Sequence, residues 1–359
     1  MQNIHFTRKE ENKIIIKLQQ AHLIGGIISY ILGVLILPFV IDFSRKEGLV
    51  DEPNERKIHK IPISRLGGIA IWLSTMATFL FLVLLSHYPY GSLLSGILLG
   101  GSLMFLLGLV DDIYNLPAKF KLLAQFLIAT LVYLLGVKIN VTISHLGMVL
   151  DLSYPITLLW IVGISNAVNF IDGVDGLAGS VVTVNSVTLA LIASTMATGN
   201  TISGLIAFIL AGSMLAFLTY NFNPARIFMG DSGALFAGFL LASLSVTGVM
   251  KGAALAVLLP FIVLAVPIID ITFASLRRIL KGKSPFVADA EHIHHKLLKA
   301  GFSQKKTVAI MTSVAIVVGA VATYFAGSIK HYVIYILALV VIMLALSLVN
   351  VVREQKLKN

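Results

Sequence analysis

The chain has 359 residues, of which 57% are hydrophobic and only 12% are charged, and its mean hydropathy is +0.93. Soluble globular domains carry about 25% charged residues, so this composition excludes an ordinary soluble protein and predicts a polytopic membrane protein. Cysteine is absent, which excludes a disulfide framework, a thiolate nucleophile and a thiolate metal site. The net charge of +10 comes from basic residues in short loops beside apolar segments, which favours anionic lipid headgroups as their partner over nucleic acid.

Continuous apolar runs predict an all-α membrane domain with about eleven transmembrane helices. A helix needs about 20 apolar residues to cross roughly 30 Å of hydrocarbon, whereas the strands of a membrane barrel alternate apolar and polar residues. The apolar runs here do not alternate. The predicted spans are 22–43, 66–86, 92–110, 120–136, 155–171, 178–197, 201–220, 228–247, 254–276, 308–327 and 332–352.

The distribution of Lys and Arg predicts the orientation of these spans. When the loop 44–65 is placed in the cytoplasm, 20 of the 27 basic residues lie on that side, which favours an outside N-terminus and an inside C-terminus. The predicted organisation is an extramembrane tail (1–21), one transmembrane catalytic domain (22–352) and a cytoplasmic tail (353–359). The predicted cytoplasmic loops are 44–65, 111–121, 172–177, 221–231 and 277–307.

Two segments outside the predicted spans have recognisable patterns. Residues 7–20 are predicted to form a surface helix. Residues 137–154 alternate apolar and polar side chains around a glycine, which predicts a short external hairpin.

Fourteen of the seventeen acidic residues fall on the predicted cytoplasmic side, and five of them mark the ends of spans. Asp111 and Asp112 end the third span, Asp172 and Asp175 end the fifth, and Asp231 opens the eighth. These carboxylates are therefore expected to converge at one membrane depth. Carboxylates about 5 Å apart repel by roughly 3 kcal/mol at an effective dielectric of 20, so the cluster requires a cation or proton uptake.

Oxygen ligands without cysteine favour Mg²⁺, with Mn²⁺ as the alternative, over zinc or copper. The competing explanation is that these acids only cap helices or pair with Lys and Arg of the loops.

The motif NFIDGVDGLAG begins at Asn169. Asn169, Asp172 and Asp175 are spaced at i, i+3 and i+6, so they share a helix face until Gly173 and Gly176 allow the chain to turn. Glycines at such a turn also let backbone N–H groups approach a phosphate closely. The motif therefore predicts an amide and two carboxylates directed at one ligand.

The motif NFNPARIFMGDSG, residues 221–233, places Asp231 at the start of a predicted helix. A carboxylate there is suited to metal binding, but it would equally cap the helix because the helix dipole favours negative charge at this end. Both interpretations stay open at this point.

The last large loop contains His292, His294 and His295 beside Asp289 and Glu291. Three histidines could coordinate a metal, bind phosphate when protonated, or orient a carboxylate. Their spacing matches no standard zinc signature, and the surrounding cations favour an anionic ligand. The cations expected to contact substrate phosphates are Lys57, Arg65, Lys121 and Arg226.

Together, carboxylates for a metal, basic loops for phosphates and helices for lipid predict phosphoryl chemistry at the cytoplasmic membrane surface. The expected substrate is an amphiphilic phosphate.

Five motifs between about Asp51 and Lys299 resemble, in order, those of the polyprenyl-phosphate N-acetylhexosamine-1-phosphate transferases, glycosyltransferase family 4. The motifs are DEPNERKIHKIPISRLGG, the Asp111-Asp112 pair followed by Asn115, NFIDGVDGLAG, NFNPARIFMGDSG and HIHH. The first-loop motif and HIHH resemble the N-acetylglucosamine branch of the family. The phospho-N-acetylmuramoyl-pentapeptide transferase branch, which remains the alternative, shows a run of three histidines.

The resemblance implies transfer of GlcNAc-1-phosphate from UDP-GlcNAc to undecaprenyl phosphate in a bacterial plasma membrane, with release of UMP, as the first membrane step of a cell-envelope polysaccharide such as teichoic acid or O-antigen. It implies that Asp231, with Asp172 and Asp112, holds Mg²⁺. A possible homodimer is left open.

The same resemblance assigns roles to further residues. Asp111 and Asp112 match an acidic pair assigned to acceptor activation or cofactor binding, and Asn169 with Asp172 matches positions lining the catalytic centre. Positions near the uridine are matched by Asp175, Asn221 and Phe228, and positions near the diphosphate or sugar by His292, His294 and His295.

Two other protein classes fit the sequence less well. A secondary transporter would carry its charges near the bilayer midplane, where only Asp270 is expected to lie deeper than the surface. A CDP-alcohol phosphotransferase would show a different aspartate motif. For the transferase, direct in-line attack by the lipid phosphate is favoured over a covalent aspartyl intermediate.

Overall fold

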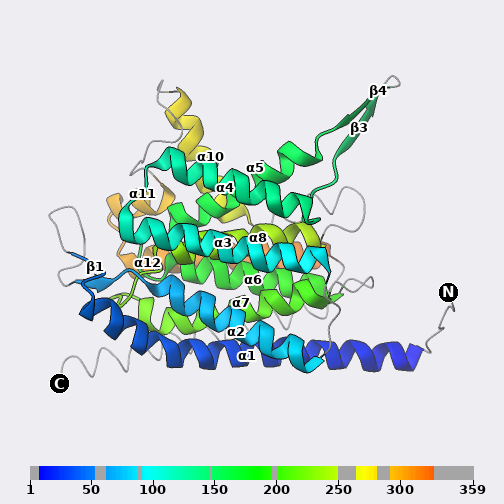
Figure 1. Cartoon of the computed structure of the whole chain (residues 1–359). Helices are drawn as coiled ribbons and strands as arrows, with labels where there is room; N and C mark the ends of the chain where they lie inside the picture. The colour runs from blue at the N-terminus through cyan, green and yellow to red at the C-terminus, as the bar shows by residue number, and fades with distance from the viewer. Residues whose placement is uncertain are drawn as a thin grey trace.

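The computed structural model describes residues 8–52, 62–86, 91–145, 148–195, 201–249, 264–280 and 292–326. In these ranges the chain is a bundle of helices with two short hairpins (Figure 1). The helices are α1 Arg8–Lys46, α2 Gly67–Ser86, α3 Ser92–Tyr114, α4 Ala118–Leu134, α5 Ser153–Ile171, α6 Leu177–Thr195, α7 Thr201–Asn221, α8 Gly230–Val249, α10 Ala265–Leu280, α11 Ile293–Lys299 and α12 Gln304–Phe325. The strands are β1 Val50–Asp51, β2 Ile63–Ser64, β3 Thr142–His145 and β4 Met148–Asp151.

Seven helices of the described part are long and apolar enough to cross a membrane, namely those containing His22–Lys46, Gly67–Leu85, Ser92–Tyr114, Ser153–Ile171, Ile202–Asn221, Gly230–Thr247 and Gln304–Phe325. The protein is thus an all-α polytopic membrane protein, as predicted. Of the other predicted spans, 178–197 corresponds to α6, whose apolar stretch Leu177–Ala193 is shorter, and 120–136 corresponds to α4. The predicted span 254–276 overlaps α10 from Ala265 onward, and its residues 254–263 lie outside the described residues. The predicted span 332–352 lies outside the described residues.

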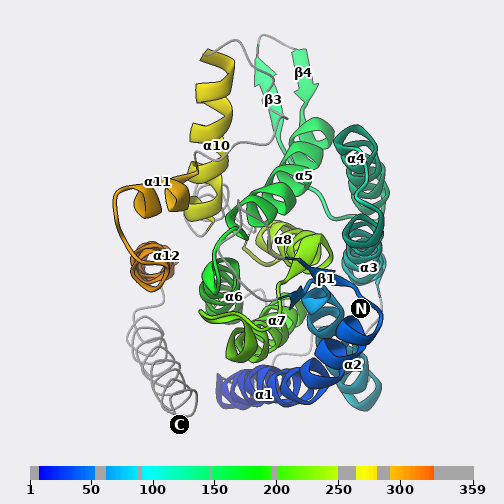
Figure 2. The same ribbon diagram turned by 90° about the vertical axis from the view of Figure 1, so that its left-hand side faces the viewer.

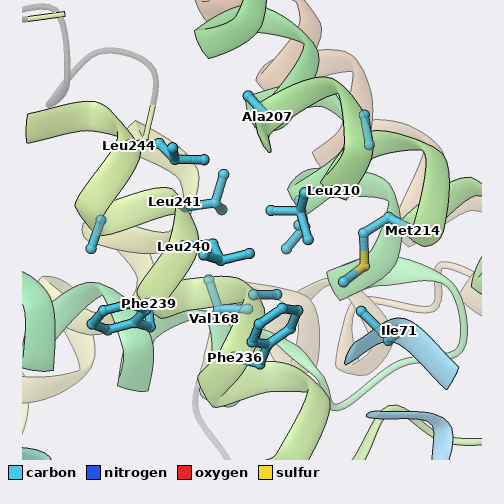
Figure 3. Close-up of a cluster of buried hydrophobic side chains, with 14 of the residues drawn as sticks. Ile71, Val168, Ala207, Leu210, Met214, Phe236, Phe239, Leu240, Leu241 and Leu244 are labelled. Atoms are coloured by element: carbon cyan, nitrogen blue, oxygen red, sulfur yellow. The ribbon is translucent and has the colours of Figure 1, made fainter. Parts of the chain in front are cut away.

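Helix α8 is the central element of the bundle. It packs against α2, α3, α5, α6 and α7, and Figure 2 shows it lying between these helices when the bundle is viewed along its length. Its side chains Phe236, Leu240 and Leu244 are fully buried or nearly so and point toward Leu210 and Met214 of α7 (Figure 3). The position of the first turn of α8 is therefore set by helices on several sides.

The outer faces of the bundle carry large apolar side chains. Phe39, Leu84 and Leu134 are each about three-quarters exposed. In a membrane protein such faces contact lipid tails, so their exposure carries no hydrophobic penalty.

The two predictions for segments outside the spans have different outcomes. The hairpin is confirmed, because β3 pairs antiparallel with β4 and Thr142 lies opposite Asp151. The predicted surface helix is helical from Arg8, but α1 runs without interruption from Arg8 to Lys46. The tail thus extends the first span instead of forming a separate element.

Candidate functional site

The acidic residues of three helices lie at one end of the bundle, which we call the carboxylate end. Asp111 and Asp112 occupy the last turn of α3, Asp172 follows the last residue of α5, and Asp231 lies in the first turn of α8. The convergence predicted from the sequence is confirmed: Lys121 bridges Asp111 and Asp231, Asp112 binds the backbone of α8 at Asp231, and Asp172 lies close enough to interact with their charges. Figure 2 views this end, where β1 and α11 also lie.

Lys121, in the first turn of α4, bridges two of the carboxylates. Its Nζ lies 2.8 Å from Asp111 Oδ2 and 2.5 Å from Asp231 Oδ2. Asn169 Nδ2 donates to the same Asp231 oxygen at 3.0 Å. Asp231 Oδ2 of α8 therefore accepts side-chain donors from both α4 and α5. The Lys121 ammonium offsets the electrostatic repulsion between Asp111 and Asp231.

Asp112 uses both of its oxygens on the backbone of α8. Asp112 Oδ1 accepts from the Asp231 N–H at 2.8 Å and Oδ2 accepts from the Ser232 N–H at 3.0 Å. These are N–H groups of the first helical turn, which have no partner within the helix. The capping role that the sequence left open for Asp231 is thus performed by Asp112, from a neighbouring helix, and the Asp231 side chain remains available to Lys121 and Asn169.

Two glycines make this approach of α3 to α8 sterically feasible. A Cβ at Gly108 would lie 2.4 Å from the backbone oxygen of Asp231, and one at Gly230 would lie 2.6 Å from Asp112 Oδ2. Gly230 also has φ of +70°, a conformation that side chains with a Cβ rarely adopt.

Asp172 lies half-buried beside this group. Burial, together with the negative charges of Asp231, Asp112 and Asp175, raises the pKa of the Asp172 carboxyl well above its ordinary value. A carboxylate in such surroundings binds cations strongly, because a positive charge relieves both penalties at once.

Asp175 and Asn221 connect the two loops that carry the aspartates. Asp175 Oδ2 accepts from the Asn223 side chain at 3.0 Å and from the Ala225 N–H at 3.1 Å. Asn221 is buried, accepts from the Gly176 N–H and donates to the Ile227 carbonyl, each at 2.8 Å. Both side chains therefore fix the backbone of the loops after α5 and before α8. Any contact that they make with a nucleotide would be additional to these bonds.

The first-loop motif pairs with the chain just before α8. The Phe228 N–H donates to the Ser64 carbonyl at 2.7 Å, and the Gly67 N–H donates to the Phe228 carbonyl at 3.0 Å. The Phe228 side chain is half-buried beside this pairing. Two motifs more than 150 residues apart in the sequence are thus joined by backbone hydrogen bonds next to the start of α8.

The four predicted phosphate-binding cations have different environments. Lys121 is in the carboxylate cluster. The Arg65 Nε lies 3.2 Å from Asp51 Oδ1, and Arg226 is exposed with its guanidinium 5.6 Å from the centre of the Tyr220 ring. Lys57 lies outside the described residues.

The histidines of HIHH are held by an acid from α10. Asp270 is buried; its Oδ2 lies 2.9 Å from His292 Nδ1, and its Oδ1 accepts from the Ile293 N–H at 2.7 Å. Asp270, which the sequence singled out only as a deeper acid, therefore orients the histidine loop. The sequence signal for this role was a carboxylate in an apolar helix, between Pro267 and the basic residues Arg277 and Arg278.

His294 is buried, and neither of its ring nitrogens has a hydrogen-bond partner among the described residues. Its ring packs against the DG turn, since a Cβ at Gly173 would lie 2.8 Å from His294 Nε2. Burial, and secondarily the neighbouring His295, lowers the pKa of His294 to about 4. The ring is thus neutral at pH 7 and offers a hydrogen-bond acceptor and a donor beside Asp172-Gly173.

The donor set of the carboxylate end suits a hard divalent cation. Its side chains are carboxylates and amides, and they already hold one positive charge, that of Lys121. Within the described ranges, three or more His, Asp or Glu side chains are nowhere gathered closely enough to hold a metal without rearrangement.

The fold and the site together define a multi-pass membrane protein with a carboxylate and lysine centre at one end of its helices. A family model for glycosyl transferase family 4 matches residues 94–249. The chain is 37% identical over 293 residues to a probable undecaprenyl-phosphate N-acetylglucosaminyl 1-phosphate transferase of Bacillus subtilis, with 80% of each chain covered.

Two further relatives have related names. A decaprenyl-phosphate N-acetylglucosaminephosphotransferase of Mycobacterium tuberculosis is 34% identical, covering 74% of this chain and 72% of its own. An undecaprenyl-phosphate alpha-N-acetylglucosaminyl 1-phosphate transferase of Escherichia coli K12 is 29% identical, covering 89% and 87%. The chain belongs to glycosyl transferase family 4.

Proposed function

We propose that the protein transfers GlcNAc-1-phosphate from UDP-GlcNAc to undecaprenyl phosphate and releases UMP. The observation that carries this proposal is the convergence of Asp111, Asp231, Lys121 and Asn169 at one end of a membrane-spanning bundle. Such a site is accessible to a water-soluble nucleotide sugar and lies beside lipid. The names of the relatives from Bacillus subtilis and Escherichia coli support this choice of donor and acceptor.

The proposed location is a bacterial plasma membrane with the carboxylate end at the cytoplasmic face. The excess of Lys and Arg in loops at this end supports an outside N-terminus and an inside C-terminus. Nucleotide sugars are cytoplasmic metabolites, so this orientation gives the site access to the donor.

The proposed reaction is a direct in-line displacement. The acceptor is a phosphate monoester with a second pKa near 6, so at pH 7 it is mostly a dianion and needs positioning more than deprotonation. One of its oxygens attacks the sugar-linked phosphorus of UDP-GlcNAc, and the bond to the UMP oxygen breaks. The Lys121 ammonium would neutralise phosphate oxygens, and its contact with Asp231, which Asn169 also holds, supports this role.

We propose Mg²⁺ as the cofactor, with Asp231 and Asp172 as its principal ligands. Asp112 is also within the cluster, although its two oxygens already accept from α8 N–H groups. Bound there, the cation would stabilise negative charge developing on the phosphate oxygens.

The remaining predicted residues are proposed to bind the donor. Phe228 is proposed to stack its ring on uracil; the hydrogen bonds of Asp175 and Asn221, which fix the loop before α8, support this role. His294 lies beside Gly173 and its ring contacts that of His295; with His292, they would contact the diphosphate or the sugar.

UMP release by the purified protein tests the proposal. Undecaprenyl phosphate and Mg²⁺ are supplied with either UDP-GlcNAc or UDP-MurNAc-pentapeptide, and EDTA is added in parallel. Release with UDP-GlcNAc that EDTA abolishes is the expected result. UMP release with the pentapeptide substrate alone would assign the protein to peptidoglycan synthesis. No UMP release with either donor would refute the proposed reaction.

A further inference from the structure

About one helical turn from Lys121 and Asn169, α4 and α5 are joined by a pair of side-chain amides. Asn166 Nδ2 donates to Gln125 Oε1 at 2.5 Å, and Gln125 Nε2 donates to Asn166 Oδ1 at 3.4 Å. Asn166 Nδ2 also donates to the Val162 carbonyl of its own helix at 2.8 Å. The two amides are thus paired reciprocally across the helix interface.

Because this pair is buried, its amide groups need hydrogen-bond partners within the protein. Gln125 is fully buried, and an amide in an apolar helix interface is strongly unfavourable if its hydrogen-bonding groups have no partner. Each amide supplies the other with both a donor and an acceptor. The two side chains therefore favour one separation and one register of α4 against α5.

The register set by this pair is transmitted to the site by helix geometry. Gln125 lies four residues after Lys121 on α4, and Asn166 lies three residues before Asn169 on α5, so each amide shares a helix face with a site residue. Lys121 and Asn169 both donate to the same oxygen, Oδ2 of Asp231. A shift of α4 along α5 would separate these two donors.

We propose that Gln125 and Asn166 are positioning residues, which act through Lys121 and Asn169 to hold both donors on Asp231. The amides touch neither Asp231 nor the reacting groups in the described contacts. Their effect on turnover rests on the proposed function, whereas their effect on helix position does not.

Exchange of side-chain lengths tests the pair by its geometry. Gln125→Asn shortens one amide and Asn166→Gln lengthens the other, so each single variant breaks the reciprocal bonds, whereas the double variant Q125N/N166Q restores the total length. We expect each single variant to lower kcat by about tenfold or more, with KM for UDP-GlcNAc nearly unchanged, because misplacement of about 1 Å can cost 100-fold in rate. The double variant should recover most of the lost kcat.

A control separates positioning from general packing. Thr75→Ala removes the buried hydrogen bond from Thr75 Oγ1 to Ser213 Oγ, 3.0 Å long, between α2 and α7. It should lower the thermal midpoint with kcat unchanged. Gln125→Met keeps the side-chain length, removes both amide bonds and should lower kcat as the shortened variant does. Wild-type kcat in Gln125→Met, or no recovery in the folded double variant, would overturn the proposal.

Helix position can be measured without turnover. Because the chain has no cysteine, spin labels on Leu123→Cys and Leu159→Cys, exposed positions of α4 and α5, report only these helices. We expect a narrow distance distribution in the otherwise native protein, a broader or shifted one with Gln125→Met, and no change with Thr75→Ala. Identical distributions in all three would refute the positioning role, while a wild-type protein without UMP release would refute only the proposed function.

Discussion

The Asp112 carboxylate caps α8, the helix whose first turn contains Asp231. It accepts the backbone N–H groups of Asp231 and Ser232 at 2.8 and 3.0 Å, so the end of α3 holds the start of α8. Asp112 therefore fixes the backbone of α8, whereas Asp111 pairs with Lys121 and accepts the Leu116 N–H beyond the end of its own helix at 2.8 Å. The two adjacent aspartates have different structural roles despite their identical chemistry.

Replacement of Asp112 should affect stability as well as turnover. Asp112→Ala removes a cap from two N–H groups, and we expect a loss of about 1–2 kcal/mol of stability. Asp112→Asn keeps one acceptor oxygen and should lose less. Thermal midpoints in detergent measure both variants, and an Asp112→Ala protein as stable as wild type would contradict the capping role.

Replacement of Asp231 should abolish turnover and leave the fold intact. Asp231→Asn removes the charge on which Lys121 and Asn169 converge, and we expect UMP release to fall by at least about 100-fold. Asp42→Asn is the matched control, because Asp42 pairs with Lys46 on the exposed surface of α1. Near-normal turnover by the purified Asp231→Asn protein would refute the assigned role.

Lys121 should be distinguishable from its neighbour Lys119. Lys121→Met leaves Asp111 and Asp231 without the cation between them, so we expect lower thermal stability and a loss of UMP release of about 100-fold. Lys119 is exposed on the same turn of α4, and Lys119→Met should leave both quantities within about twofold of wild type. Equal effects of the two substitutions would show that net charge of this loop matters and the bridge does not.

The close approach of α3 to α8 can be tested with a pair of glycines. Gly108→Ala forces a methyl group against the Asp231 backbone oxygen, and we expect a loss of about 1–3 kcal/mol together with lower kcat. A Cβ at Gly163 of α5 meets no atom of the described structure within 4 Å. Gly163→Ala should therefore be neutral or stabilising by about 0.5–1 kcal/mol, because alanine is the better helix former. Thermal midpoints and UMP release of the two variants provide the comparison.

His294 predicts a pH dependence of stability with a defined sign. Its pKa is about 4 in the folded protein and about 6.5 in an unfolded chain, so below pH 6.5 the unfolded chain binds a proton that the folded protein does not. Stability should therefore fall as the pH drops from about 6.5 to 4, by about 3 kcal/mol from this group. The rings of His295 and His292 lie beside that of His294 and lower its pKa further, whereas the Asp270 carboxylate raises it. His294→Gln should show a shallower fall of the thermal midpoint over this range.

Much of the site could be predicted because aspartates in a membrane protein are costly and therefore informative. The positions of Asp111, Asp172 and Asp231 at span ends were sufficient to predict their convergence. The division of labour between Asp111 and Asp112 could not be predicted, since it depends on which carboxylate faces the first turn of α8. That choice is made by helix packing and close contacts such as the one at Gly108.

The amides and the deeper acid were harder to interpret from the sequence. Gln125 and Asn166 are 41 residues apart and follow no motif of catalysis, so only the contact between α4 and α5 reveals their pairing. Asp270 stood out as an acid in an apolar segment, but its partner, His292, lies 22 residues further along the chain. Pairings of this kind depend on tertiary structure and have no local signature.

The central place of α8 has a practical consequence for handling the protein. Asp231 is positioned by a helix that contacts five others, whereas Phe39, Leu84 and Leu134 lie on the outer faces of the bundle. The outer faces can therefore be redesigned to suit a detergent, a nanodisc or a crystal lattice without altering the reaction centre. Antibody fragments for imaging are best directed at the β3–β4 hairpin, which projects from the end of the bundle opposite the carboxylate end (Figure 1).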